Sequence, residues 1–312
     1  MTQPLISIVT ACYNEEQNVR PLHEAVKAVM AKHPQYRFEH IFADNCSQDG
    51  TRAALRALCA EEPNARAIFN ARNFGVIRSG TNALHAARGD AVIGMAADFQ
   101  EPPEMIHEFL RHWEAGAKVV LAQKTSSSES GLFFRLRGLY YRLLDRIADV
   151  RIEQQVTGFG LFDRKVMDAL KRMNDPLPFM RGLIAEIGYA PVLVPFHQPP
   201  RAHGVSTQNF YSLYETAMLG IIGHSRVPLQ LATMLGFAMS ALSLLVALGY
   251  LIAKLLFWNA MPLGVAPILI GFFCLTSVQL FFIGIVGEYV GTIWTHVRHV
   301  PYVFETERIN FD

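Results

Sequence analysis

The chain has 312 residues, with 28 lysines and arginines against 27 aspartates and glutamates, so its formal net charge is +1. This balance gives no support to a nucleic-acid-binding protein, which needs a basic surface. Hydrophobic residues make up 51% of the chain and charged residues 18%, and the mean hydropathy is +0.20. The composition excludes a disordered chain and a wholly soluble protein, and it predicts a globular part of about 200 residues followed by a membrane part.

The N-terminal part of the chain alternates between strand and helix patterns. Short apolar runs predict buried strands, and segments with helical spacing of apolar residues lie between them. The predicted strands are 5–11, 38–43, 67–69, 90–97 and 118–122, and the predicted helices are 15–32, 49–59, 77–87 and 102–113. This rhythm is typical of an α/β fold with a mostly parallel, Rossmann-like sheet and helices on both faces.

Polar and acidic residues gather directly after the first four predicted strands, in segments 12–16, 44–51, 70–75 and 98–104. Ligands of open α/β sheets bind beyond the carboxyl ends of the strands. Carboxylates there suit a ribose, a base N–H or a divalent cation better than a bare pyrophosphate. Neither G-x-G-x-x-G after the first strand nor a P-loop pattern occurs, so a dinucleotide dehydrogenase is disfavoured and a P-loop ATPase is excluded.

Two long runs without a charged residue follow, at 227–253 and 266–287. Each exceeds the roughly 20 helical residues that cross a hydrocarbon core about 30 Å thick. A buried helical hairpin in a soluble core is the alternative. The outer flanks carry Arg201, Arg226, Arg298 and Arg308, and the connecting turn is uncharged, which places both flanks in the cytoplasm. The first residues lack a basic region followed by an apolar core, so no signal peptide is expected.

Two segments before the first span predict contact with the membrane surface. Leucines and arginines alternate at helical spacing over 132–149, which is typical of an amphipathic helix in the headgroup plane. Guanidinium groups bind phosphate through paired hydrogen bonds, so Arg135 and Arg137 are candidates for holding a lipid phosphate. An ordinary surface helix is the alternative for this segment. Residues 209–223 predict an interfacial helix leading into the first span.

The four loop segments, in this order and followed by two spans, resemble the family 2 inverting glycosyltransferases with the glycosyltransferase-A fold. The polyprenyl-phosphate branch, which includes bactoprenol glucosyltransferases and dolichol-phosphate mannose synthases, is the more similar one. The resemblance covers nearly the whole chain. Its motifs are Tyr13-Asn14-Glu15, the loop 44–51, Arg72-Asn73-Phe74-Gly75, the loop 98–104 and, after the second apolar run, 284–291 with Pro301-Tyr302.

This resemblance implies inverting transfer of a hexose or N-acetylhexosamine from a nucleoside-diphosphate sugar, with a UDP-sugar expected, to undecaprenyl or another polyprenyl phosphate. It implies that the nucleotide sugar is bound by Tyr13, Glu15, Asp44, Asn45, Arg72 and Asp98. Turn capping at a strand end is the alternative role for Asp44. Asp98 and Gln100 are the expected ligands of Mg²⁺ or Mn²⁺ on the diphosphate.

The remaining implied roles concern the reaction and the acceptor. Asp98 and Arg201 are the expected catalytic residues, and Glu186 is a candidate base. The acceptor phosphate is expected to contact Arg135, Arg137, Arg201 and Ser206. Partners are then the nucleotide sugar, the lipid and the membrane, with homo-oligomerisation through the spans expected from relatives.

The sequence departs from the family pattern at identifiable positions. Ala96 stands where the family has the first Asp of Asp-x-Asp, so one metal-binding carboxylate is missing. Ala11 stands where Pro is common. The segment 157–164 replaces Gly-Asp-Phe-Arg-Leu without its acid or its arginine. A catalytically weak nucleotide-sugar-binding scaffold protein of the same pathway is therefore the alternative function.

The predicted organisation has four parts. A cytoplasmic glycosyltransferase-A catalytic domain covers 1–206, and an interfacial juxtamembrane helix lies within 207–226. A two-helix transmembrane domain covers 227–297, and a cytoplasmic tail covers 298–312. The expected location is the inner (plasma) membrane, with both termini in the cytoplasm and a role in cell-envelope glycan modification.

Overall fold

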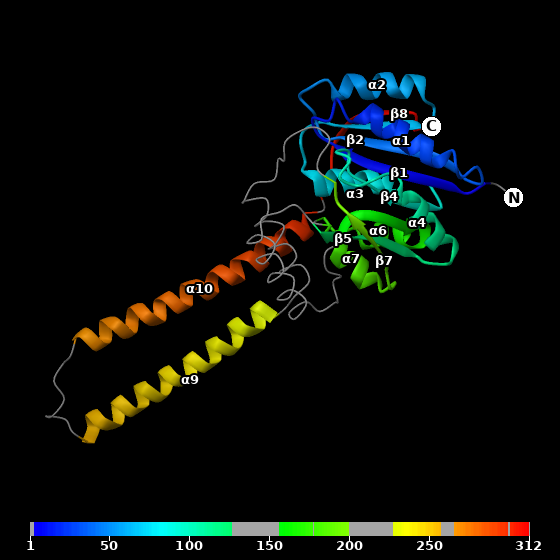
Figure 1. The fold of residues 1–312 in the computed structure, drawn as a ribbon. Helices are drawn as coiled ribbons and strands as arrows, with labels where there is room; N and C mark the ends of the chain where they lie inside the picture. Colours follow the sequence, from blue (N-terminus) through cyan, green and yellow to red (C-terminus); the bar gives the residue numbers. More distant parts are fainter. Residues whose placement is uncertain are drawn as a thin grey trace.

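An eight-stranded sheet forms the centre of the N-terminal domain in the computed structural model, which describes residues 3–126, 156–176, 178–199, 227–256, 265–298 and 300–311 (Figure 1). The strand order is β7-β5-β6-β4-β1-β2-β3-β8. The strands are β1 (Leu5–Cys12), β2 (Arg37–Asp44), β3 (Ala65–Asn70), β4 (Ala91–Gly94), β5 (Val119–Ser126), β6 (Val156–Asp163), β7 (Val192–His197) and β8 (Glu305–Ile309).

Strands β4, β1, β2 and β3 are parallel neighbours, which confirms the predicted α/β fold with a mostly parallel sheet. The direction of winding reverses between β1 and β4, and open α/β sheets bind ligands at such a switch point. Three antiparallel pairings extend this core: β6 pairs with both β4 and β5, and β8 pairs with β3. The sequence patterns had predicted only the first five strands.

Helices cover both faces of the sheet because successive strand side chains point to opposite sides. In β1, Ile8 packs into one buried cluster and Val9 into the other. The first cluster includes side chains of α1 (Val19–Met30), α2 (Thr51–Glu61) and α4 (Met105–Glu114). The second includes side chains of α3 (Val76–Ala86), α6 (Arg164–Met173) and α7 (Met180–Ile187).

Gly160 in β6 explains one departure from the family pattern. A Cβ atom at this position would lie 2.4 Å from the carbonyl oxygen of Val120 in β5. The β5–β6 register shifts nearby, between Leu121 and Gln123. The arginine of the family motif therefore has no room at position 160. Gly158 is different, because a Cβ there would meet no atom within 4 Å.

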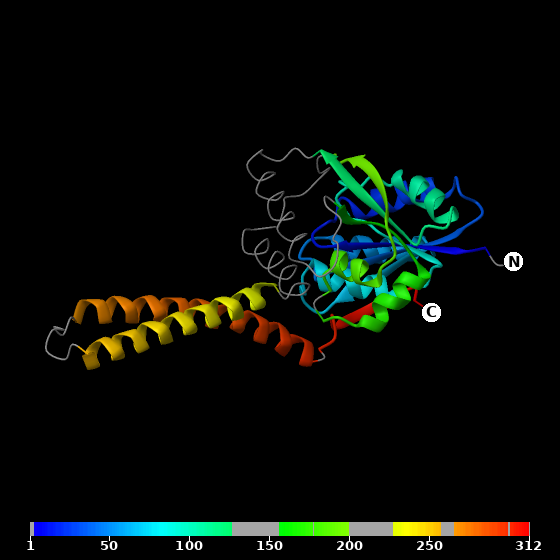
Figure 2. The same cartoon turned by 90° about the horizontal axis from the view of Figure 1, so that it is seen from below.

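Helices α9 (Val227–Leu256) and α10 (Val265–Val297) form a hairpin that projects from the domain (Figures 1 and 2). By length and composition, Val227–Val246 and Leu275–Val297 could each cross a membrane, and their side chains are almost entirely exposed. This exposure contradicts the alternative of a helical hairpin buried in a soluble core. Segments 132–149 and 209–223, expected at the membrane surface, lie outside the described residues.

The end of the chain returns to the sheet. Residues 298–312 were expected to form a tail, but β8 lies within them and pairs with β3. The Asn310 side chain donates to the carbonyl oxygens of Cys59 and Ala65 at 2.8 and 2.9 Å. The last residues thus belong structurally to the N-terminal domain.

The sheet is oriented with its ligand-binding edge toward the hairpin. Figures 1 and 2 show the N-terminus, where β1 begins, at the end of the domain away from α9 and α10. Since β1 to β4 run parallel, their carboxyl ends all lie at the other end, from which the hairpin projects.

Candidate functional site

The loops that follow β1 and β2 hold each other in place. The backbone N–H of Asn14 donates to Ser47 Oγ at 2.9 Å, and the N–H of Gln48 donates to Asn14 Oδ1 at 2.8 Å. The N–H of Glu15 donates to Thr51 Oγ1 at 2.8 Å. Asn14 has a φ of 59°, a left-handed conformation that asparagine adopts more readily than most residues. Tyr13 and Glu15 are thus presented from a fixed turn.

Two acids of these loops serve the start of α2. Glu16 Oε2 accepts the Gly50 N–H at 3.1 Å, and Asp49 Oδ1 accepts the Thr51 N–H at 3.0 Å. Burial acts to raise the pKa of Asp49, but the hydrogen bonds from the Thr51 hydroxyl and backbone outweigh it and leave this pKa below its usual value. Negative charge at a helix N-terminus is favourable. These two carboxylates are therefore structural.

Asp44 lies fully buried at the carboxyl end of β2. Its two oxygens are 3.2 and 3.4 Å from the N–H nitrogen of Ser47, which is the turn-capping arrangement. Arg52 Nε is 3.4 Å from Asp44 Oδ2. Arg52 was not predicted from the sequence; the available signal was that a buried carboxylate needs a cationic partner. A carboxylate has about four acceptor positions, so these contacts leave capacity for a further donor.

Asn45 connects the loop after β2 with the loop after β3. Its Nδ2 donates to Asn73 Oδ1 at 2.7 Å. Its Oδ1 accepts from Asn70 Nδ2 at 3.2 Å and from the Phe74 N–H at 2.9 Å. Asn73 Oδ1 also accepts the Gly75 N–H at 2.8 Å. Asn45 is buried, so the contacts that the structure shows for it position the third loop.

Two arginines flank Phe74 where α3 begins. The Arg72 guanidinium lies 4.1 Å from the centroid of the Phe74 ring and also donates to the Asn73 carbonyl at 3.0 Å. Arg78 lies 5.7 Å from the same centroid. Burial, and then the charge of Arg72, lowers the pKa of Arg78. Two cations beside a helix N-terminus create a local field that attracts anions.

The fourth loop folds back on itself around Asp98. Asp98 is 5% exposed, and its Oδ1 accepts the Gln100 N–H at 3.2 Å. Phe99 has a φ of 59°, which makes the turn tight. Glu101 is also buried, and its Oε2 accepts the Ala96 N–H at 2.6 Å. The loop therefore brings a second carboxylate to the backbone of Ala96, the position of the missing family acid.

The residues of the fourth loop fit a metal ion only if the substrate supplies some of its ligands. Among the described residues, no group of three or more His, Cys, Asp or Glu side chains could hold a metal ion. Mg²⁺ usually binds one or two protein carboxylates together with waters and substrate phosphates. The carboxylate of Asp98 and the side-chain oxygen of Gln100 are hard donors of the required kind. They match a cation held jointly with a diphosphate.

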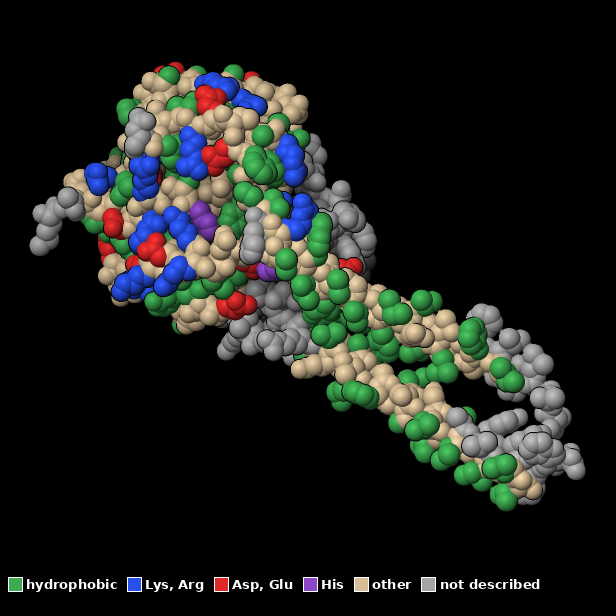
Figure 3. Space-filling view, turned by 180° about the vertical axis from the view of Figure 1, so that it is seen from behind, with side chains coloured by type: hydrophobic (Ala, Val, Ile, Leu, Met, Phe, Trp, Pro, Cys, Tyr) green, Lys and Arg blue, Asp and Glu red, His purple; other side chains and the backbone are tan. Residues whose placement is uncertain are grey.

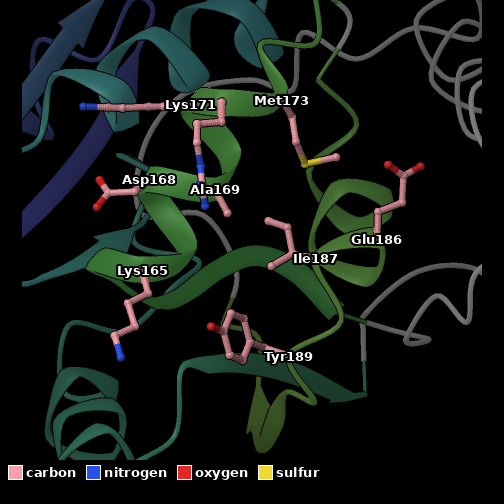
Figure 4. A pocket seen from close by; sticks show the side chains of 9 residues that line it. Lys165, Asp168, Ala169, Lys171, Met173, Glu186, Ile187 and Tyr189 are labelled. Atoms are coloured by element: carbon pink, nitrogen blue, oxygen red, sulfur yellow. The ribbon is translucent and has the colours of Figure 1, made fainter.

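The expected residues Arg135, Arg137, Arg201 and Ser206 lie outside the described residues. Glu186 lies on α7 beside an open hollow of about 1000 Å³ between α6 and α7. Figure 4 shows Glu186 among the side chains that line this hollow, with Ala169 and Ile187. None of the residues of the four loops lines it. The structure therefore places the candidate base apart from the cluster of loops.

The parallel β4-β1-β2-β3 core, with its polar loops at the switch point, defines a domain of the glycosyltransferase-A type. The sequence profile of glycosyl transferase family 2 matches residues 7–171. The chain belongs to this family, as the loop motifs predicted.

Two relatives extend the similarity over nearly the whole chain. One is the bactoprenol glucosyl transferase of Shigella phage SfV, 31% identical over 97% of this chain and 99% of the relative. Another is the SfII prophage-derived bactoprenol glucosyl transferase of Shigella flexneri, 31% identical over 95% of this chain and 96% of the relative. This similarity agrees with the polyprenyl-phosphate branch.

Among solved structures, the chain is similar to glucosyl-3-phosphoglycerate synthase from Mycobacterium tuberculosis in complex with phosphoglyceric acid. The identity is 16% and the TM-score 0.48, over 70% of this chain and 78% of that one.

Proposed function

We propose that the protein transfers a hexose or N-acetylhexosamine, with inversion, from a UDP-sugar to undecaprenyl or another polyprenyl phosphate. The reaction takes place at the cytoplasmic leaflet of the inner membrane and serves cell-envelope glycan modification, with both termini in the cytoplasm. The observation that carries this proposal is the gathering of four polar loops at the sheet edge that faces the helix hairpin. The similarity to bactoprenol glucosyl transferases supports the same acceptor class.

On the donor side, Tyr13, Glu15, Asp44 and Arg72 contact the nucleotide, and Asn45 holds the third loop against the second. Asp98, with Gln100, holds Mg²⁺ or Mn²⁺ on the donor diphosphate. The cation neutralises charge on the departing diphosphate when bound. The tight turn that fixes Asp98 supports this role, because electrostatic stabilisation depends on groups that are already in position.

On the acceptor side, Arg135, Arg137, Arg201 and Ser206 bind the lipid phosphate, with Arg201 also acting as a catalytic residue. One phosphate oxygen forms a bond to the anomeric carbon while the bond from that carbon to the nucleoside diphosphate breaks. The attacking oxygen is already anionic, so a strong general base is not required. Catalysis then depends on positioning and on stabilising the leaving group. This chemistry tolerates the absence of the family acid at position 158.

A donor panel tests the proposal. Purified full-length protein in detergent is mixed with undecaprenyl phosphate, Mg²⁺ or Mn²⁺, and one labelled nucleotide sugar at a time. We expect one UDP-sugar to give a lipid-linked product that accumulates with time. Absence of lipid-linked product from every donor, with binding of UDP intact, would contradict transferase activity.

Ala96 supports a second candidate, a nucleotide-sugar-binding scaffold protein with weak catalysis. One lost carboxylate lowers the affinity for a divalent cation, because hard cations bind through such oxygens. The same panel separates the two functions. Metal-dependent UDP binding without transfer favours the scaffold, whereas turnover favours the enzyme. Ala96→Asp is the matched variant, since it restores the family carboxylate in the same loop.

A further inference from the structure

Exposed apolar side chains and arginines form a patch where the domain meets the hairpin. Val76, at the first position of α3, is 67% exposed, and Phe304, just before β8, is 58% exposed. Val300, Arg72 and Arg298 are also exposed. We call these five residues the α3–α10 patch. Large apolar side chains clustered on a surface commonly mark an interaction site.

Two segments distant in sequence are held together to make this patch. The Ala71 N–H donates to the Phe304 carbonyl at 2.8 Å. Arg78 Nη2 donates to the Pro301 carbonyl at 2.7 Å, which ties the first turn of α3 to the segment after α10. The rings of Phe74 and Phe304 are 6.3 Å apart between centroids. These contacts fix the start of α3 beside the segment that carries Phe304, so Val76 and Phe304 lie on one surface.

The patch is continuous with the exposed end of α10. Trp294 and Val297 are exposed in its last turns, and the Arg298 guanidinium lies 4.6 Å from the Trp294 ring. Tryptophan and arginine are typical of the membrane–water interface. The apolar segment Leu275–Val297 ends directly before Arg298. Figure 3 shows hydrophobic side chains continuing from the hairpin onto the adjoining end of the domain, with Lys and Arg beside them.

The charges near the patch favour binding to an anionic surface. Glu305, the closest acid in sequence to Phe304, is engaged by Arg308 and Asn82. Asp175 Oδ1 lies 3.2 Å from His296 Nε2. Glu305 is thus paired with a cation, whereas Arg72 and Arg298 keep exposed cationic groups beside apolar side chains. Apolar groups ringed by basic ones bind to membranes that contain anionic lipids.

We propose that the α3–α10 patch is a docking surface for the anionic headgroup layer of the bilayer, on which the domain rests. Docking holds the third loop, Arg72 to Gly75, at the lipid surface, because that loop supplies Arg72 and leads directly into Val76. The sheet edge with the four loops then faces the membrane at a fixed height. This contact is additional to any made by the segments before α9.

The test measures the distance of the patch from lipid without requiring turnover. Full-length protein is placed in nanodiscs, one chain per disc, with an environment-sensitive fluorescent amino acid at position 76. The discs contain phosphatidylglycerol and a lipid with a nitroxide quencher near its headgroup. The matched control carries the same fluorophore at Lys32, which is exposed in the connection between α1 and the amino end of β2.

We expect strong quenching at position 76 and little at position 32. With no nucleotide present, so that Arg72 is not engaged by the donor, replacing phosphatidylglycerol with phosphatidylcholine should lower the ratio of docked to undocked protein by about fivefold for each arginine of the patch. Val300→Glu should reduce quenching at position 76 while UDP binding and the unfolding midpoint stay unchanged. Lys32→Glu, which introduces the same charge at the control position, should leave quenching at position 76 as it was.

Two results would overturn the proposal. One is equal quenching at positions 76 and 32 in discs that contain phosphatidylglycerol. The other is a position-76 probe that is shielded only in discs holding two chains, which would assign the patch to contact between copies of the protein. Since neither readout depends on sugar transfer, failure here is distinct from failure of the proposed activity.

Discussion

Asn45 links the second and third loops through three hydrogen bonds, to Asn73, Asn70 and the backbone of Phe74. Asn45→Ala removes all of them. A net loss of about 1 kcal/mol for each bond predicts that the closed arrangement of the loops weakens by about 3 kcal/mol, or roughly a hundredfold. Asn45→Asp should be no milder, since it places a buried carboxylate oxygen against Asn73 Oδ1, which already accepts the Gly75 N–H, and beside the buried Asp44.

The assay is amide hydrogen exchange at Phe74 and Gly75, combined with the affinity for UDP-sugar. In Asn45→Ala these amides should exchange up to about a hundredfold faster, because local opening requires less free energy. Donor affinity should fall in both Asn45→Ala and Asn45→Asp. The change should appear in donor affinity and the donor KM more than in the affinity for the lipid.

Asn310→Gly is the matched control for loss of an asparagine. The Asn310 side chain makes two hydrogen bonds to backbone carbonyls away from the loops, and glycine tolerates its φ of 62°. This variant should lower the free energy of unfolding without changing the donor affinity. If Asn45→Ala left the exchange of Phe74 and Gly75 as slow as in wild type, or if both variants lost donor affinity equally, the positioning role of Asn45 would be refuted.

Three further outcomes follow from other parts of the fold. Asp98→Asn should lower turnover by roughly a hundredfold or more while the protein melts normally, and near-wild-type rates would remove Asp98 from the metal role. Gly160→Ala should cost about 1–3 kcal/mol in urea unfolding, since its Cβ would lie 2.4 Å from the Val120 carbonyl; an unchanged midpoint would show that β5 can shift. Burial, and then the charge of Lys171, lowers the pKa of His85 to about 4. Because the unfolded value is about 6.5, stability is complete above that pH and falls as the pH approaches 4, by about 1–2 kcal/mol at pH 5. His85→Phe should reduce this acid sensitivity in denaturant titrations, and an identical pH profile would contradict it.

The part of the fold that sequence patterns predicted is the part made by local periodicity. β1 to β5 and α1 to α4 occur in the predicted order, with ends shifted by a few residues. Each strand is an apolar run and each helix has an apolar stripe, and both follow from the backbone repeat of that element. The two long helices were also predicted, because a long apolar run with few charged residues indicates a helix that can cross a membrane.

β6, β7 and β8 escaped prediction because their local sequences, with glycines, a proline or charged residues, interrupt the apolar strand pattern. β6 contains two glycines that interrupt the strand pattern, and one of them exists to allow the close approach of β5. β8 is short and largely charged, so its sequence resembles an exposed tail. It becomes a strand because the chain after α10 passes along the edge of β3, whose unpaired backbone N–H and C=O groups form hydrogen bonds with it.

The candidate site also has features that the sequence predicted and contacts that only the tertiary structure shows. The amino-acid sequence by itself determined the family, the positions of the four loops and the identity of the polar side chains on them, because motif and spacing are properties of the chain. Only the tertiary structure decided what those side chains contact: Asp44 meets Arg52, Asn45 bridges two loops, and the Glu101 carboxylate reaches the backbone of Ala96. The physical reason is that hydrogen bonds and ion pairs form across strands and loops whose distance is set by sheet packing, which no local pattern encodes.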